Sequence, residues 1–82
     1  MKLLLISKPN GWLWFVFDGS PHRLVAKAPS PKRNLDAARK SAWRKDARFK
    51  TIPESVCYAM DRVPQWFLNW ESQRKATSTG VL

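Results

Sequence analysis

The sequence predicts an α+β fold in which a three-stranded antiparallel meander is packed by a basic helix and by a C-terminal helix or helix pair. Three short apolar runs near the start are separated by breaks of four or five residues, which suit hairpins and not crossovers. A charged segment with helical periodicity follows, and a second helical pattern occupies the C-terminal third. A chain of 82 residues suffices for one domain. We expect residues 1–75 to form a single compact domain and residues 76–82 a flexible tail.

The predicted strands cover residues 3–7, 11–17 and 23–28. The first run ends at the turn sequence Lys8-Pro9-Asn10-Gly11, and the second ends at Asp18-Gly19-Ser20-Pro21. The third run is followed by a Pro-Ser-Pro connector, which ends the strand because proline cannot continue the ladder.

The middle strand is apolar on both faces, since two sets of side chains alternate along it: Trp12, Trp14 and Val16, and Leu13, Phe15 and Phe17. One interpretation is that each helical part covers one face, which makes Trp12 and Trp14 core residues. Another is that one aromatic face stays partly open, to stack bases, to receive a protein partner or to associate with itself.

The basic helix is predicted to follow Asn34, which is a good N-cap residue. Its apolar stripe contains small alanines that let it lie close to the sheet, and Trp43 lies at one edge of the stripe. The stripe consists of Leu35, Ala38, Ala42 and Phe49.

Eight Lys or Arg residues lie between positions 32 and 50, opposed only by two Asp, so this segment carries +6 of the +9 formal charge. Lys40, Arg44 and Arg48 recur at i, i+4 and i+8, which places them in one line on the outer face. Three more cations flank the apolar stripe, with stems that can cover apolar surface: Arg39, Lys45 and Lys50. The line is either a solvated helix face or a surface that contacts an anion. Like charges in a line cost helix stability unless an anion neutralises them.

The C-terminal pattern begins at Thr51-Ile52-Pro53-Glu54, which has capping-box spacing and predicts a helix over residues 52–62. Pro64 either kinks one long helix or separates this helix from a second one, and the bias of the residue before proline favours the break. Apolar residues continue at helical spacing through both parts: Val56, Ala59, Met60, Val63, Phe67 and Trp70. We expect Trp66, Phe67 and Trp70 to pack on the sheet or on the basic helix.

Residues for catalysis or metal binding are scarce. His22 is the only histidine, beside a turn, and we interpret it as a loop residue. Cys57 falls in the predicted helix, where we expect a buried small hydrophobe. One His and one Cys do not make a metal site, and the three glycines do not form a phosphate loop. The sequence therefore predicts a protein without catalytic or metal-binding residues and without a cofactor.

The single cysteine also fits a reducing compartment. The apolar run at the start has four residues, shorter than the roughly 7–15 of a secretory signal, and no run approaches the ~20 residues of a membrane span. We expect a cytoplasmic protein.

The order of an aromatic strand, a glycine turn, a second apolar strand and an Ala-containing helix resembles the repeating unit of YegP-like small proteins. The residues that carry the resemblance are Trp12–Gly19, Leu24–Ala26 and Leu35–Ala42, so it covers about residues 11–43. It implies an antiparallel hairpin against which a helix packs, and no particular activity. The order of three strands and a helix is also similar to the arm-type DNA-binding domains of phage integrases, although here the charge lies on the helix and not on the sheet.

Two functional hypotheses follow. The first is a small nucleic-acid-binding protein that contacts phosphates through Lys40, Arg44 and Arg48. The second is an inhibitor or adaptor of the kind phages and mobile elements encode, which docks on a host protein or nucleoprotein complex through Trp and Arg anchors and meets an acidic surface. In either case the possible stacking or interface residues are Trp12, Trp14 and Trp43. A basic protein on an anionic membrane is a third possibility, for which the polar face of the C-terminal helix has few lysines.

Overall fold

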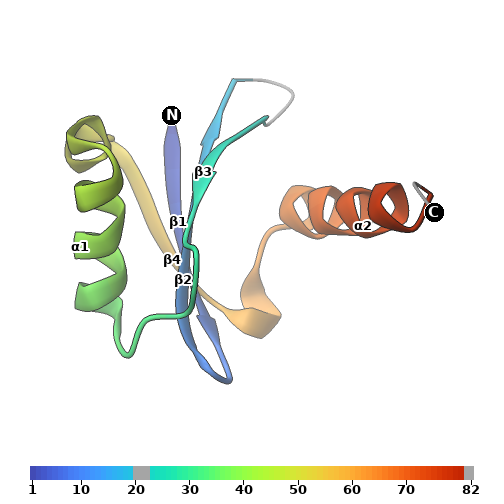
Figure 1. The fold of residues 1–82 in the computed structure, drawn as a ribbon, viewed down its shortest axis with the longest axis horizontal. Helices are drawn as coiled ribbons and strands as arrows, with labels where there is room; N and C mark the ends of the chain where they lie inside the picture. Colours follow the sequence, from blue (N-terminus) through green and yellow to red (C-terminus); the bar gives the residue numbers. More distant parts are fainter. Residues whose placement is uncertain (20–22, 81–82) are drawn as a thin grey trace.

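The computed structural model describes residues 1–19 and 23–80, and for residues 75–80 it describes the backbone alone. Within this part of the chain, four strands form one mixed sheet in the order β3-β2-β1-β4, and two α-helices lie on opposite sides of it (Figure 1). The predicted α+β class is confirmed, and the sheet has one strand more than predicted.

The predicted meander is present. It consists of β1 (Lys2–Lys8), β2 (Gly11–Asp18) and β3 (Arg23–Lys27), each antiparallel to the next. Leu5 lies opposite Trp14 in the β1–β2 ladder. The turn at residues 9 and 10 and the Asp18-Gly19 sequence at the end of β2 therefore lie where the turn signals indicate.

The helix predicted over residues 52–62 is wrong, because residues 54–59 form a strand. This strand, β4 (Glu54–Ala59), pairs in parallel with β1, and Cys57 lies beside Leu5. The predicted capping box is absent as well. Thr51 instead donates its hydroxyl to the Arg48 carbonyl at 2.9 Å, at the end of a 3₁₀ turn.

The basic helix, α1 (Leu35–Lys45), is a crossover connection, because β3 and β4 both run parallel to β1. Asn34 caps it as predicted, with its side chain accepting a hydrogen bond from Ala37 N at 2.8 Å. The helix ends earlier than its pattern suggests. Asp46 accepts a hydrogen bond from the Arg48 backbone N–H at 2.9 Å, and this caps the 3₁₀ turn η1 (Ala47–Thr51) instead of continuing α1.

Each face of the sheet packs against one helical part, as the first interpretation of the aromatic strand predicts; Trp14 is a core residue, whereas Trp12 is half-buried. On the α1 side a buried cluster joins sheet and helix: Leu3, Leu5, Trp14, Val16, Ala28, Ala38, Ala42 and Phe49. On the α2 side the buried residues are Leu4, Ile6, Phe15, Phe17 and Phe67. Because successive side chains of β2 point to opposite faces of the sheet, its aromatic residues contribute to both buried clusters.

The second helix, α2 (Gln65–Gly80), begins directly after Pro64, as predicted if this proline separates the second helix from the segment before it. The Pro64 carbonyl accepts hydrogen bonds from Phe67 N and Leu68 N, at 3.0 and 3.2 Å. The short 3₁₀ turn η2 (Met60–Arg62) connects β4 to this helix.

The first two turns of α2 attach it to the sheet through edge-to-face aromatic pairs. Phe17 lies 5.0 Å from both Trp66 and Trp70 between ring centroids, and Phe15 lies 5.0 Å from Phe67. This confirms the predicted packing of these residues. Beyond that point α2 extends away from the sheet (Figure 1).

Three predictions concern the ends and loops of the chain. Residues 76–80 belong to α2, and residues 81 and 82 lie outside the described part, so the flexible tail stays a prediction. His22 also lies outside the described residues. Within the described part of the chain, no helix is long and apolar enough to span a membrane.

Candidate anion-binding surface

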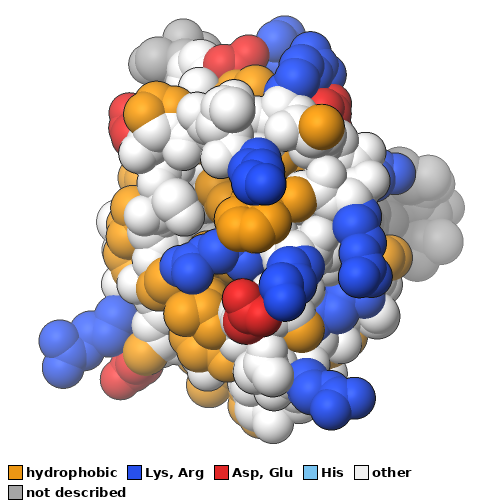
Figure 2. All heavy atoms as spheres, turned by 90° about the vertical axis from the view of Figure 1, so that its left-hand side faces the viewer, with side chains coloured by type: hydrophobic (Ala, Val, Ile, Leu, Met, Phe, Trp, Pro, Cys, Tyr) orange, Lys and Arg blue, Asp and Glu red, His pale blue; other side chains and the backbone are white. Residues whose placement is uncertain are grey.

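The outer side of α1 carries most of the cations that the sequence singles out. Ala38 and Ala42 are fully buried against the sheet, which leaves Lys40 and Arg44 on the exposed side of the helix. Figure 2 shows this side of the molecule, with Lys and Arg side chains around a central hydrophobic patch. We refer to the following residues as the cationic face: Lys32, Arg39, Lys40, Arg44, Lys45, Arg48 and Lys50.

The predicted line of Lys40, Arg44 and Arg48 is not continuous, because Arg48 lies in η1 and not on α1. Two of its members also have acidic partners that the sequence interpretation did not assign to this face. Lys40 Nζ lies 3.1 Å from the Asp36 carboxylate, one helical turn away, and Arg48 Nη2 lies 2.6 Å from that of Asp46. Arg44 has no ion pair or hydrogen bond within the described part of the chain.

The Asp46–Arg48 pair shifts the protonation of both groups. Hydrogen bonds from the Arg48 side chain, and then from its backbone N–H, lower the pKa of Asp46 below the usual value of 3.8. The same side-chain hydrogen bonds raise the pKa of Arg48. Both groups therefore stay charged at neutral pH, and the Arg48 charge is balanced locally.

The flanking cations take three different positions. Arg39 turns toward β4, with Nη2 3.9 Å from Cys57 Sγ. Lys50 Nζ lies 5.6 Å from the centre of the Trp43 ring, in a cation–π contact. Lys45 is exposed, and no acidic partner for it exists among the described residues.

The three candidate tryptophans are not equivalent. Trp14 is fully buried, and its indole Nε1–H donates to Ser41 Oγ at 3.1 Å, so it is not accessible for stacking. Trp12 is half-buried and contacts the first core. Trp43 is half-buried on the cationic face, where it lines a shallow hollow with Lys40, Arg44, Ala47 and Lys50.

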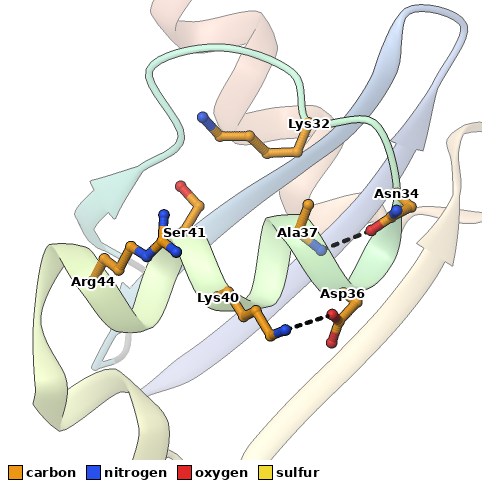
Figure 3. Close-up of a pocket in the computed structure, with 7 residues that line it drawn as sticks. All are labelled: Lys32, Asn34, Asp36, Ala37, Lys40, Ser41 and Arg44. Atoms are coloured by element: carbon orange, nitrogen blue, oxygen red, sulfur yellow. Dashed lines mark hydrogen bonds and ion pairs between the residues drawn. The ribbon is translucent and has the colours of Figure 1, made fainter.

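A second hollow lies between α1 and the linker at residues 28–34, with a volume of about 360 Å³ (Figure 3). We call it the Ser41 hollow. Its polar lining consists of Lys32, Asn34, Asp36, Lys40, Ser41 and Arg44. The sequence interpretation did not include Lys32, Asn34 and Ser41 in a site, because they come together only when the linker folds back onto β2.

Cys57 is exposed on β4, so the predicted burial of this residue in a helix is wrong. It shares the α1 side of the sheet with Ser55 and Ala59, since these residues pair with the alternate positions of β1 that face α1. Among the described residues, no group of three His, Cys, Asp or Glu side chains is placed to hold a metal ion.

Fold and surface together define a small α+β domain with a mixed sheet covered on both faces and a cationic crossover helix. No protein-family model matches the chain, and neither a curated protein nor a solved structure is found to be similar to it. The resemblance of residues 11–43 to the YegP-like unit therefore stays a prediction.

Proposed function

We propose that this protein binds nucleic acid through its cationic face, by contacts to phosphates and without reading sequence. The observation that carries the proposal is a group of four cations on the cationic face. Within the described part of the chain, they have neither an acidic partner nor a side-chain hydrogen bond: Lys32, Arg44, Lys45 and Lys50.

The arrangement of charge favours a polyanion over a solvated surface. A surface adapted only to solvent mixes both signs, whereas here the two acids of the segment are already paired with Lys40 and Arg48. The remaining cations attract phosphates over roughly a Debye length, and each phosphate contact releases counterions. Because phosphates carry no sequence information, such contacts give affinity and not specificity.

The test compares two triple variants that lose the same charge. Lys40→Ala/Arg44→Ala/Lys45→Ala removes cations of α1, and Arg23→Ala/Lys27→Ala/Arg62→Ala removes exposed cations elsewhere. At about 0.5–1 kcal/mol for each exposed cation, we expect the α1 variant to bind a labelled oligonucleotide roughly tenfold or more weakly, and the control variant to bind nearly as the wild type does. Fluorescence anisotropy measures both. Equal losses in the two variants contradict the proposal.

A second candidate function is supported by the edge of the sheet. β3 is a short edge strand with exposed Arg23 and Lys27, which hinder the addition of another strand. The opposite edge strand, β4, has Val56 exposed to 41%, and Met60 directly after it is exposed to 49%. Such an edge fits an extended segment of a protein partner, added as a fifth strand.

This adaptor or inhibitor function is distinguished from the first by a pull-down from lysate with and without nuclease. It predicts a stoichiometric protein that survives nuclease treatment and is lost with Val56→Lys, which places a charge on the edge. The nucleic-acid function predicts that nuclease removes the retained material and that Val56→Lys has no effect.

A further inference from the structure

The Ser41 hollow is held by a fixed backbone connection between the linker and β2. Lys32 and Trp12 form an isolated antiparallel bridge, with N–O distances of 2.7 and 2.8 Å. Gly11 makes this approach possible, because a Cβ at that position would lie 2.5 Å from the Lys32 carbonyl oxygen. The position of the Lys32 backbone is therefore fixed by two hydrogen bonds to Trp12 of β2.

Hydrogen bonds to the core determine which groups of the hollow remain free. Ser41 Oγ accepts the indole N–H of Trp14, and its own hydroxyl hydrogen has no acceptor among the described residues. Asn34 uses its side-chain oxygen to accept from Ala37 N, which leaves its amide N–H₂ as a donor. Both neutral side chains are thus arranged to donate to a ligand in the hollow.

The charged residues of the hollow also favour a ligand that accepts hydrogen bonds and carries negative charge. Asp36 is its one acidic lining residue, and it is paired with Lys40 at 3.1 Å. Lys32 and Arg44 have no acidic partner within the described part of the chain. Figure 3 shows that Lys32, Ser41 and Arg44 direct their polar ends toward the same side of the hollow.

We propose that the Ser41 hollow is a seat for one phosphate group of the bound strand, an inference that rests on the proposed function. Phosphate is rich in acceptors, and the free polar groups of the hollow are donors. Lys32 supplies a point charge and Arg44 a planar fork of donors. Ser41 supplies a neutral donor whose orientation is fixed from behind by Trp14.

The seat can be tested without nucleic acid, by NMR titration with inorganic phosphate. We expect saturable shifts of the Trp14 indole N–H, which donates to Ser41, and of the side-chain amide of Asn34, which lines the hollow itself. The indole N–H of Trp66, on the other side of the sheet, is the internal control. Sodium chloride at equal ionic strength is the second control. Shifts that chloride reproduces overturn the seat.

Two neighbouring cations provide the matched test with an oligonucleotide. Lys32 lines the hollow and Arg33 does not. We expect Lys32→Ala to lower the magnitude of the log–log salt slope on duplex DNA by about 0.9, and Arg33→Ala to change it much less. Equal effects of the two substitutions overturn the seat.

Ser41 gives a different signature because it is neutral. Ser41→Ala should weaken binding about 2- to 13-fold at every salt concentration, with an unchanged slope, whereas Ser41→Thr keeps the hydroxyl and most of the affinity. Circular dichroism checks that Ser41→Ala folds, since it leaves the Trp14 indole N–H without an acceptor. If it does not fold, the comparison of Lys32 with Arg33 decides.

Failure of the seat and failure of the proposed function give different results. If the wild type binds an oligonucleotide but Lys32→Ala and Arg33→Ala behave alike, the seat is wrong and the function stands. If the wild type binds no nucleic acid at low salt, the function is wrong, and the response of the Trp14 indole to inorganic phosphate decides whether the hollow still binds this anion.

Discussion

Gly11 is the residue whose conformation links the hairpin to the linker. It has φ of +135°, and a Cβ there would meet the backbone oxygen of Lys32 at 2.5 Å. Because the clash is with a backbone oxygen that cannot rotate away, and because alanine rarely adopts this φ, we expect Gly11→Ala to lower the free energy of unfolding by about 1–3 kcal/mol. Urea denaturation measures the change. An unchanged free energy would show that the bridge between Trp12 and Lys32 is dispensable.

Asp46 makes stability depend on pH. The pKa of Asp46 is lower in the folded than in the unfolded state. Its carboxylate therefore stabilises the fold above the unfolded pKa near 3.8, and this stabilisation is lost as the pH falls through the lower folded pKa. Asp46→Asn should therefore be less stable than the wild type at pH 7. The difference should shrink as the pH falls below 3.8 and through the lower folded pKa, because the wild-type carboxylate then becomes protonated as well. Denaturation at pH 7 and over a series of acidic pH values measures it, and a difference that stays constant over the series contradicts this account of the pair.

At the scale of elements, local signals predict much of the fold. The three strands of the meander, the N-cap at Asn34 and the break at Pro64 follow from turn, capping and proline chemistry within a few residues. β4 does not follow from such signals. Its apolar residues also satisfy a helical period, and the decisive interaction is pairing with β1, about 50 residues earlier in the chain.

Local signals also predict part of the cationic face. The charges of α1 can be read from helical spacing, and so can the pairing of Lys40 with Asp36 at i and i−4. The position of Lys32 depends on the linker folding back to Trp12, and the free hydroxyl hydrogen of Ser41 depends on a bond from Trp14 across 27 residues. Neither is a periodic property of the sequence.

The attachment of α2 leads to a prediction for two adjacent residues. Phe67 is fully buried among aromatic rings, whereas Leu68 is 43% exposed. Phe67→Ala should cost about 3–5 kcal/mol of unfolding free energy, because it leaves a cavity between helix and sheet. Leu68→Ala should cost no more than about 0.5 kcal/mol. Chemical denaturation of both variants measures this, and similar losses would mean that the first two turns of α2 do not anchor it.

At the scale of the whole molecule, the sheet separates two different surfaces. Small alanines and one indole connect it to α1, so the outer side of that helix can be occupied by cations. A cluster of aromatic rings connects the other face to α2 (Figure 1). The side chains of β2 thus pack against both helices, and the cationic face lies on the α1 side.

We propose that the cationic face binds the phosphates of a nucleic acid. The salt dependence of this binding is the most direct test. The four cations of the cationic face that have neither an acidic partner nor a side-chain hydrogen bond within the described part of the chain imply about four neutralised phosphates. For four phosphates, the slope of log K against log salt on duplex DNA is about −3.6. We expect that slope for the wild type and a markedly smaller one for Lys40→Ala/Arg44→Ala/Lys45→Ala. A slope near zero, or no binding at about 50 mM salt, would contradict the account.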